Sequence, residues 1–278
     1  MIKFTKAHAY GNDFLYVRRA EVGHRVAVEA LAIDMCARHT GIGADGLIIF
    51  DPTPDGASMR LLNADGSPSE VSGNGVRGLA ALLLRDDPRA DAAVTIHSDG
   101  GVKELVRTAR DESTQTFRAA MGLPLDLRQV SATVDGEPLL LTVMTFGNPQ
   151  CVVLGPLPDE ARFRRLGPAL ERHALFPNRT NVEFASVEAR DSVRILIWER
   201  GVGPTTSSGT GSCASLIAAA AFGGAARKAH VVAPGGTQLV DWRDDNVYLT
   251  GPAELLVDGE WLGQIPRTRQ TDPDQILR

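Results

Sequence analysis

Two stretches, Ser72-Gly73-Asn74-Gly75 and Ser208-Gly209-Thr210-Gly211, share the pattern Ser-Gly-x-Gly and lie 136 residues apart (from 72 to 208). The same offset carries Gly11-Asn12 onto Gly147-Asn148. In a chain of 278 residues, a repeat at about half the length indicates two copies of one structural unit. Two equivalent loops can then face each other across a cleft and offer one reactive group to each side of a substrate.

Each repeat contains short runs of β-type residues and one apolar helix. The predicted strands are 14–17, 47–50, 94–96, 151–154 and 194–198. The predicted helices run from Val76 to a stop before Pro88, and from Cys213 to Gly223-Gly224. Both are apolar nearly all round, which is typical of an enclosed helix. We therefore predict an α/β (α+β) fold of two pseudo-symmetric halves, each a curved, mostly antiparallel sheet wrapped around a central helix.

The domain boundaries follow from the repeat and from local polarity. The stretch 108–116 is rich in Arg, Asp, Glu and Ser and is the predicted linker. This gives an N-terminal half over 1–112 and a C-terminal half over 113–263, with the polar tail 264–278 joining the first half. Halves of about 135 residues are of ordinary domain size.

Composition limits the classes of partner. A formal charge of −5 provides no basic surface for nucleic acid. The start of the chain has no signal peptide pattern, and the apolar run 214–222 is too short to span a membrane. Three widely spaced cysteines form neither a disulfide framework nor a metal-ligand cluster. We expect a cytoplasmic protein that uses no metal.

The Ser-Gly-x-Gly loops are candidate anion sites. Each one opens a helix, where free backbone N–H groups and the helix dipole favour a carboxylate, and glycine allows close approach. A single copy would be read as an ordinary serine cap. Two copies in register favour a ligand site. Neither loop has the glycine spacing of a nucleotide-binding motif, so no cofactor is expected.

Polar residues near the loops suit a zwitterionic amino acid. An asparagine amide can hydrogen-bond a carboxylate or an amine, although each alone is most often a turn residue. Glu199, which the offset pairs with Asn63, can bind an ammonium group, and Arg200 can bind a carboxylate. The four candidate amides are Asn12, Asn63, Asn148 and Asn181. Cys213 is interpreted as a core residue.

At these residues the chain resembles the diaminopimelate epimerase family over almost its whole length. The matching motifs are Lys6–Phe14, Arg38–Gly46, Asn63–Gly66, Gly147–Pro149, Asn181–Phe184, Glu199–Gly203, Pro234–Gly236 and Gly251–Ala253. The resemblance implies that family's two-halved fold, a homodimer and a cofactor-independent interconversion of LL- and meso-diaminopimelate, a step toward lysine and peptidoglycan.

The resemblance also implies roles for individual residues. Asn12, Asn63, Asn148, Asn181, Glu199 and Arg200 match substrate-binding positions. Gly73, Asn74, Gly209 and Thr210 match the loops that hold the α-carboxylate of the substrate in family members. The two acid/base positions match Ser72 and Ser208, where family members carry cysteines.

The two serines leave three alternatives open, because a hydroxyl is a much weaker acid than a thiol and needs an adjacent base. The chain is a natural epimerase with slow or rerouted proton transfer, an engineered Cys→Ser form, or a paralogue. The paralogue would bind an amino acid without turnover, or would isomerise another substrate with Glu70 or Glu199 as its base.

Overall fold

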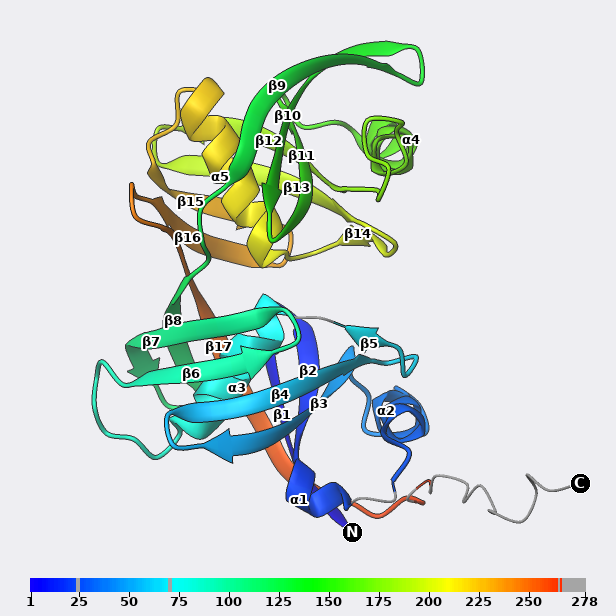
Figure 1. Ribbon diagram of the computed structural model, residues 1–278, viewed down its shortest axis with the longest axis vertical. Coiled ribbons are helices and arrows are strands. Elements are labelled where there is room, and N and C mark those ends of the chain that lie inside the picture. Colours follow the sequence, from blue (N-terminus) through cyan, green and yellow to red (C-terminus); the bar gives the residue numbers. More distant parts are fainter. Residues whose placement is uncertain (24–25, 70–71, 265, 267–278) are drawn as a thin grey trace, which may run out of the picture.

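Two halves of similar architecture lie one above the other in the computed structural model, which describes residues 1–23, 26–69, 72–264 and 266 (Figure 1). The first half contains β1 (Ile2–Ala9), β2 (Asn12–Arg18), α1 (Arg19–Val22), α2 (Val28–Cys36), β3 (Gly46–Thr53), β4 (Gly56–Asn63), β5 (Pro68–Ser69), α3 (Gly73–Leu83), β6 (Ala93–Ser98), β7 (Gly101–Asp111) and β8 (Thr114–Ala120). The second contains β9 (Leu125–Val134), β10 (Glu137–Phe146), β11 (Asn148–Leu154), α4 (Glu160–Glu171), β12 (Asn181–Ala189), β13 (Ser192–Glu199), β14 (Gly203–Thr205), α5 (Gly209–Phe222), β15 (Lys228–Ala233) and β16 (Gly236–Trp242).

The repeat seen in the sequence is a repeat of structure. The bounds of β11 lie 136 residues beyond those of β2 (12 to 148), and β13 follows β4 by the same offset (56 to 192). The parallel pairs β2–β3 and β4–β6 recur as β11–β12 and β13–β15, among neighbours that are otherwise antiparallel. The predicted fold of two pseudo-symmetric halves is confirmed.

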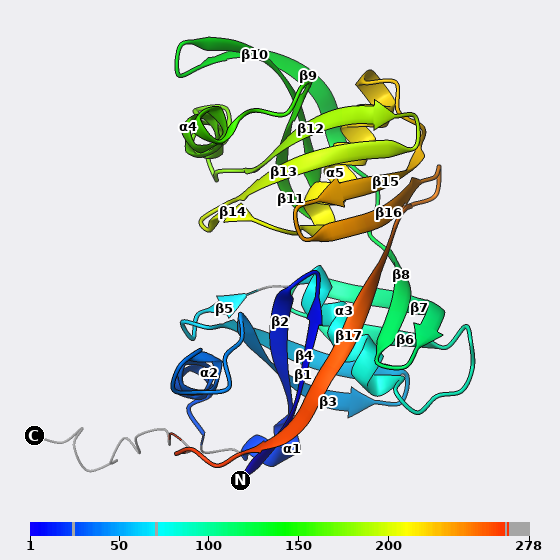
Figure 2. The same ribbon diagram turned by 180° about the vertical axis from the view of Figure 1, so that it is seen from behind.

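Each half encloses one central helix. In α3, Leu79, Ala80 and Ala81 are fully buried against strands of the first half. In α5, Leu216 and Ile217 are buried in the second half in the same way. Both helices begin earlier than predicted, at Gly73 and Gly209, because the preceding serine caps the first turn and holds the glycines in it. Helices α2 and α4 pack on the outer side of the strands, as Figure 2 shows.

The repeated Gly-Asn has a conformational cause. Gly11 and Gly147 occupy the turns that join β1 to β2 and β10 to β11, with φ of 80° and 75°. This left-handed region favours glycine, which has no Cβ to clash with the backbone. Each turn therefore places an asparagine, Asn12 or Asn148, at the first position of the next strand.

The predicted linker is wrong. The stretch 108–116 is the tip of the β7–β8 hairpin, in which Asp111 pairs with Thr114 and Arg107 with Phe117. Polar residues suit an exposed hairpin tip as well as a linker, so composition could not separate the two. The chain crosses to the second half after β8, and we propose that point as the domain boundary in place of 112/113.

Strand β17 (Val247–Trp261) joins the halves. It pairs in turn with β16, β8 and β1, and so runs from the second half along the first (Figure 1). Beyond it, the Pro266 carbonyl accepts a hydrogen bond from the Ala27 amide at 2.9 Å, on the first half. The rest of the tail, from 267, lies outside the described residues.

Candidate active site

The two serines occupy equivalent positions. Ser72 caps α3 and accepts a hydrogen bond from the Gly75 amide at 3.2 Å; Ser208 caps α5 and accepts one from Gly211 at 3.2 Å. Both helices begin at the seam between the halves, where α3 contacts α5 and the Tyr10 hydroxyl donates to the Thr237 carbonyl (Figures 1 and 2). The positive ends of two helix dipoles therefore meet at one place in the molecule.

Ser208 is next to a pair of carboxyl groups. Its hydroxyl interacts with the side chain of Glu199, the last residue of β13. Burial raises the pKa of Glu199, and the contact with Ser208 opposes that rise. Glu183 on β12 is fully buried, and burial raises its pKa well above the usual value, with the charge of Glu199 adding to the effect. Both carboxyl groups therefore favour the protonated form more than an exposed glutamate does, Glu183 the more strongly.

Gln150 connects this pair to the helix end. With its nitrogen turned toward Glu183, its amide donates to both carboxyl oxygens, at 3.1 and 3.2 Å. Its oxygen then accepts from the Thr210 hydroxyl at 3.3 Å, and Asn148 lies within hydrogen-bonding distance of the same amide. Gln150 is fully buried, so these contacts satisfy groups that water does not reach.

The Ser72 side has amides and an arginine instead. The Asn74 amide donates to the Asn12 oxygen at 3.2 Å, and Asn12 donates to Asp45 at 2.6 Å. Arg77, one turn along α3, is 2% exposed and donates to the Asn74 oxygen. Burial lowers the pKa of Arg77, whose Nε has no hydrogen-bond partner within the described part of the chain.

Three predicted binding residues are engaged in their own loops. Asn63 is exposed and its amide donates to Ser67 at 3.0 Å. Asn181 is buried, and its oxygen accepts from the backbone amide of Arg200 at 2.9 Å. The Arg200 side chain is exposed and donates to the Asn178 carbonyl at 3.3 Å. Asn181 thus fixes the backbone that carries Arg200.

Glu171, at the end of α4, holds the turn after β13. One of its oxygens accepts from the Trp198 indole and the other from the Gly201 amide, each at 3.0 Å. Burial would raise the pKa of Glu171, but these hydrogen bonds and the charges of Arg172 and Arg179 outweigh it and lower the pKa. This carboxylate therefore fixes both ends of the turn Glu199-Arg200. The sequence analysis missed it because its partners are far along the chain.

The backbone at the helix ends differs in its free space. A Cβ added to Gly73 would meet no atom of the described residues within 4 Å, whereas one added to Gly209 would meet Leu249 at 3.2 Å. Open space beside Gly73 leaves room for a ligand at the N-terminus of α3. Glu70, the alternative base, lies outside the described residues.

The cysteines take no part in this arrangement. Cys36, Cys151 and Cys213 are free and buried, which confirms Cys213 as a core residue. Burial raises the pKa of all three thiols, that of Cys36 to about 12. None of them supplies a thiolate to replace the missing ones at 72 and 208.

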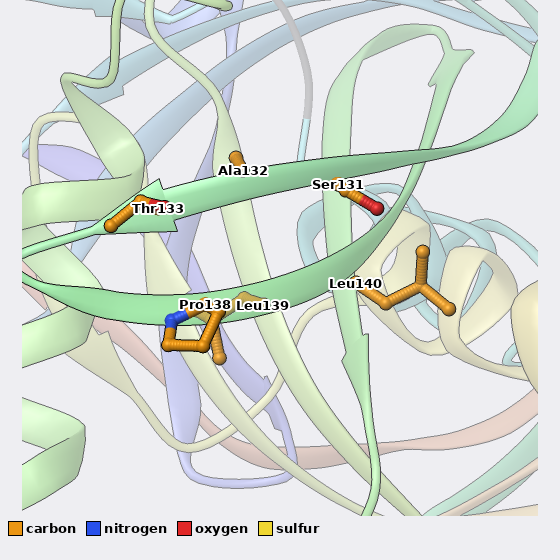
Figure 3. Close-up of a pocket in the computed structure, with 6 residues that line it drawn as sticks. All are labelled: Ser131, Ala132, Thr133, Pro138, Leu139 and Leu140. Atoms are coloured by element: carbon orange, nitrogen blue, oxygen red, sulfur yellow. The ribbon is translucent and has the colours of Figure 1, made fainter.

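Other features offer less chemistry. A surface hollow in the β9–β10 hairpin is lined by Ser131, Ala132, Thr133, Pro138, Leu139 and Leu140, with no titratable side chain (Figure 3). In the described ranges, no group of three or more His, Cys, Asp or Glu side chains is placed to hold a metal ion. None of the described helices is long and apolar enough to cross a membrane.

Comparison with known proteins gives a consistent result. The family model described as diaminopimelate epimerase matches residues 4–124 and 142–256. A diaminopimelate epimerase of Desulforudis audaxviator is 39% identical over 279 residues, covering 94% of this chain and 99% of the relative. That of Bacteroides thetaiotaomicron is 37% identical over 265 residues, with 94% and 98% covered.

The solved structures support the fold. A predicted epimerase from Pseudomonas aeruginosa is 17% identical and superposes with a TM-score of 0.70, covering 95% of this chain and 100% of that one. A probable proline racemase from Agrobacterium radiobacter, also 17% identical, gives a TM-score of 0.68 with 98% and 95% covered.

Proposed function

The chain belongs to the diaminopimelate epimerase family and is an epimerase-like isomerase, and on that basis we propose that it interconverts LL- and meso-diaminopimelate. One group removes the proton from the α-carbon and a second returns one from the opposite face. We place this reaction in lysine and peptidoglycan biosynthesis in the cytoplasm, carried out by a homodimer without cofactor.

One observation carries the proposal: the two central helices begin at the same seam, each with a serine at its cap. An α-carboxylate placed between the helix ends would accept hydrogen bonds from free backbone N–H groups, at the positive ends of both dipoles. The same groups stabilise the charge that develops on the carboxylate when the α-proton leaves.

The weak acidity of the two serine hydroxyls should slow proton transfer and so limit turnover. A serine hydroxyl needs an adjacent base to accept a proton, and we propose Glu199 as that base for Ser208, a role that their interaction supports. We therefore propose Ser72 and Ser208 as the acid/base pair, with turnover orders of magnitude below that of a thiol enzyme.

The substrate would be held by residues of both halves. The Ser72 side provides Asn12, Asn63, Gly73 and Asn74, and the Ser208 side provides Asn148, Asn181, Gly209 and Thr210. Glu199 is suited to the ammonium group as well as to Ser208, and the exposed Arg200 to a carboxylate.

A second candidate follows from the serines themselves. A paralogue that binds an amino acid with little or no turnover, or that isomerises a different substrate, would keep the helix ends without the thiols.

Deuterium uptake distinguishes these functions. The chain is incubated with LL-diaminopimelate in heavy water, and binding is followed by calorimetry. Deuterium at the α-carbon together with formation of the meso isomer supports the epimerase. Binding without uptake, with uptake restored in the Ser72→Cys/Ser208→Cys form, identifies an inactive scaffold. No binding by either form would remove the substrate assignment.

A further inference from the structure

The proposed reaction is taken here as given, and on it we propose that the two faces of the site are unequal: Ser208 with Glu199 exchanges the α-hydrogen of one stereoisomer with solvent faster than the isomer is inverted. Ser72 returns the proton on the other face and limits inversion. The further activity is solvent exchange with retention of configuration.

The lining of the Ser208 cap is polar. A Cβ placed on Gly211 would lie 2.6 Å from Glu183 Oε1 and 3.1 Å from Ser208 Oγ. The absent side chain of Gly211 therefore lets a buried carboxyl group approach the capping hydroxyl. Gln150 ties that carboxyl to Thr210, so the Ser208 end of α5 is surrounded by groups that carry or orient protons.

Among the described residues, the atoms next to Gly75 in the first turn of α3 are hydrocarbon. A Cβ placed on the equivalent residue, Gly75, would lie 2.8 Å from Ile48 Cδ1 and 3.7 Å from Phe14 Cε2. The offset of 136 replaces Glu199 by Asn63, Glu183 by Leu47 and Gln150 by Phe14. An amide is not a base at neutral pH. Asn63, at the position equivalent to Glu199, therefore cannot accept a proton from Ser72.

In this exchange, a hydrogen leaves the α-carbon and another returns on the same face, next to Ser208. The Cα–H bond breaks and its proton bonds to Ser208 Oγ, while the hydroxyl proton of Ser208 passes to a Glu199 oxygen. The electron pair moves into the α-carbon–carboxylate system, next to the helix N-terminus. Glu199 is half-buried and so trades its proton with water. The Ser208 hydroxyl, which now holds the former α-hydrogen, swaps this proton for the solvent proton on Glu199. The reverse transfer then delivers a solvent hydrogen to the same face.

The state of Glu183 favours Glu199 as the single base for Ser208. Burial and the charge of Glu199 raise the pKa of Glu183 well above its usual value, which favours the protonated form of Glu183 and leaves Glu199 as the carboxyl group that serves Ser208 as base. The seryl hydroxyl thus has a defined acceptor for its proton.

The test compares LL- and meso-diaminopimelate in heavy water. Recovered starting material and product are analysed for deuterium at early times by NMR and mass spectrometry, and binding of each isomer is measured by calorimetry. We expect one isomer to take up deuterium at least about tenfold faster than it is inverted, while the other takes it up no faster than inversion. Equal uptake by both isomers overturns the inference. Binding without uptake by either isomer also overturns it and leaves the substrate assignment standing; absence of binding overturns both.

A matched pair of variants assigns the faces. Ser72→Ala and Ser208→Ala remove the same kind of helix cap, so they are alike in their effect on folding. Ser208→Ala should abolish the fast exchange, and Ser72→Ala should abolish inversion while the fast exchange remains. Glu70→Gln is the control for the alternative base, which lies two residues before Ser72 in the sequence. Loss of the fast exchange in this variant, or survival of the fast exchange in Ser208→Ala, contradicts the assignment.

Discussion

The carboxyl groups of Glu183 and Glu199 lie close enough together in the second half for the charge of one to raise the pKa of the other. Burial raises the pKa of both groups, because a low-dielectric environment disfavours the negative charge. The first half has leucine and asparagine at the equivalent positions, 47 and 63. The structural repeat is thus symmetric in its backbone and asymmetric in its acid–base chemistry.

Glu183 should make stability depend on pH. Its folded pKa is raised above the unfolded value of 4.5, so the unfolded state releases a proton first as the pH rises. Between 4.5 and the folded pKa, the chain should lose about 1.4 kcal/mol per pH unit relative to Glu183→Gln, and below 4.5 the difference between the two should no longer change with pH. Urea denaturation over a pH series measures the difference. Parallel curves for the two proteins would show that Glu183 is ionised in the fold.

Glu171 should control the turn that carries Glu199 and Arg200. Glu171→Gln keeps the shape but removes the charge that accepts from Trp198 and Gly201, and we expect a loss of about 1–3 kcal/mol in the free energy of unfolding with weaker substrate binding. Glu160→Gln on the same helix is the control, because its exposed pair with Arg164 contributes at most about 1 kcal/mol. Denaturation and calorimetry should separate the two variants; equal effects would deny Glu171 this role.

The glycines at the helix ends should respond differently to alanine. The methyl group of Gly73→Ala meets no atom in the part of the chain that the structure describes, so stability should stay the same or rise by up to about 1 kcal/mol, while this methyl group weakens ligand binding. Gly211→Ala forces Glu183 and Ser208 to move and should cost about 1–3 kcal/mol. Thermal denaturation and ligand titration check both. If Gly73→Ala binds the ligand as tightly as the unmodified chain, the ligand does not lie at the N-terminus of α3.

Native thiols should be unreactive. Cys36, Cys151 and Cys213 are buried and their pKa values are raised, so an aromatic disulfide reagent should label none of them at neutral pH until the chain unfolds. A cysteine introduced as Ser72→Cys lies at a helix N-terminus, which lowers a thiol pKa, and should react at once. Rapid labelling of the unmodified chain would mean that the core opens around a native cysteine.

The sequence predicted the features that repeat. The two Ser-Gly-x-Gly stretches located both central helices, and their apolar composition predicted the enclosure of Leu79 and Leu216. Local polarity failed at 108–116, because a hairpin tip and a linker have the same composition. Glu199 was recognised as a site residue, but its contact with Ser208 depends on how β13 meets the cap of α5.

The buried polar residues were missed for a related reason. Glu183, Gln150 and Glu171 gain their roles from partners brought near by strand pairing and helix packing. Each sits in a motif or helix where its neighbours in sequence gave no sign of burial. Arg77 was overlooked because a single charge in an apolar helix reads as an exposed residue.

The central claim is that Ser72 and Ser208 hold the two acid/base positions on either side of one α-carbon. The most direct test is the rate of LL- to meso-diaminopimelate conversion by the Ser72→Cys/Ser208→Cys form, with each single variant as control. We expect the double variant alone to exceed the unmodified chain by about 10²–10⁴-fold, the range that positioned acid–base groups contribute. A double variant that binds the substrate as tightly yet converts it no faster than the unmodified chain would contradict the claim.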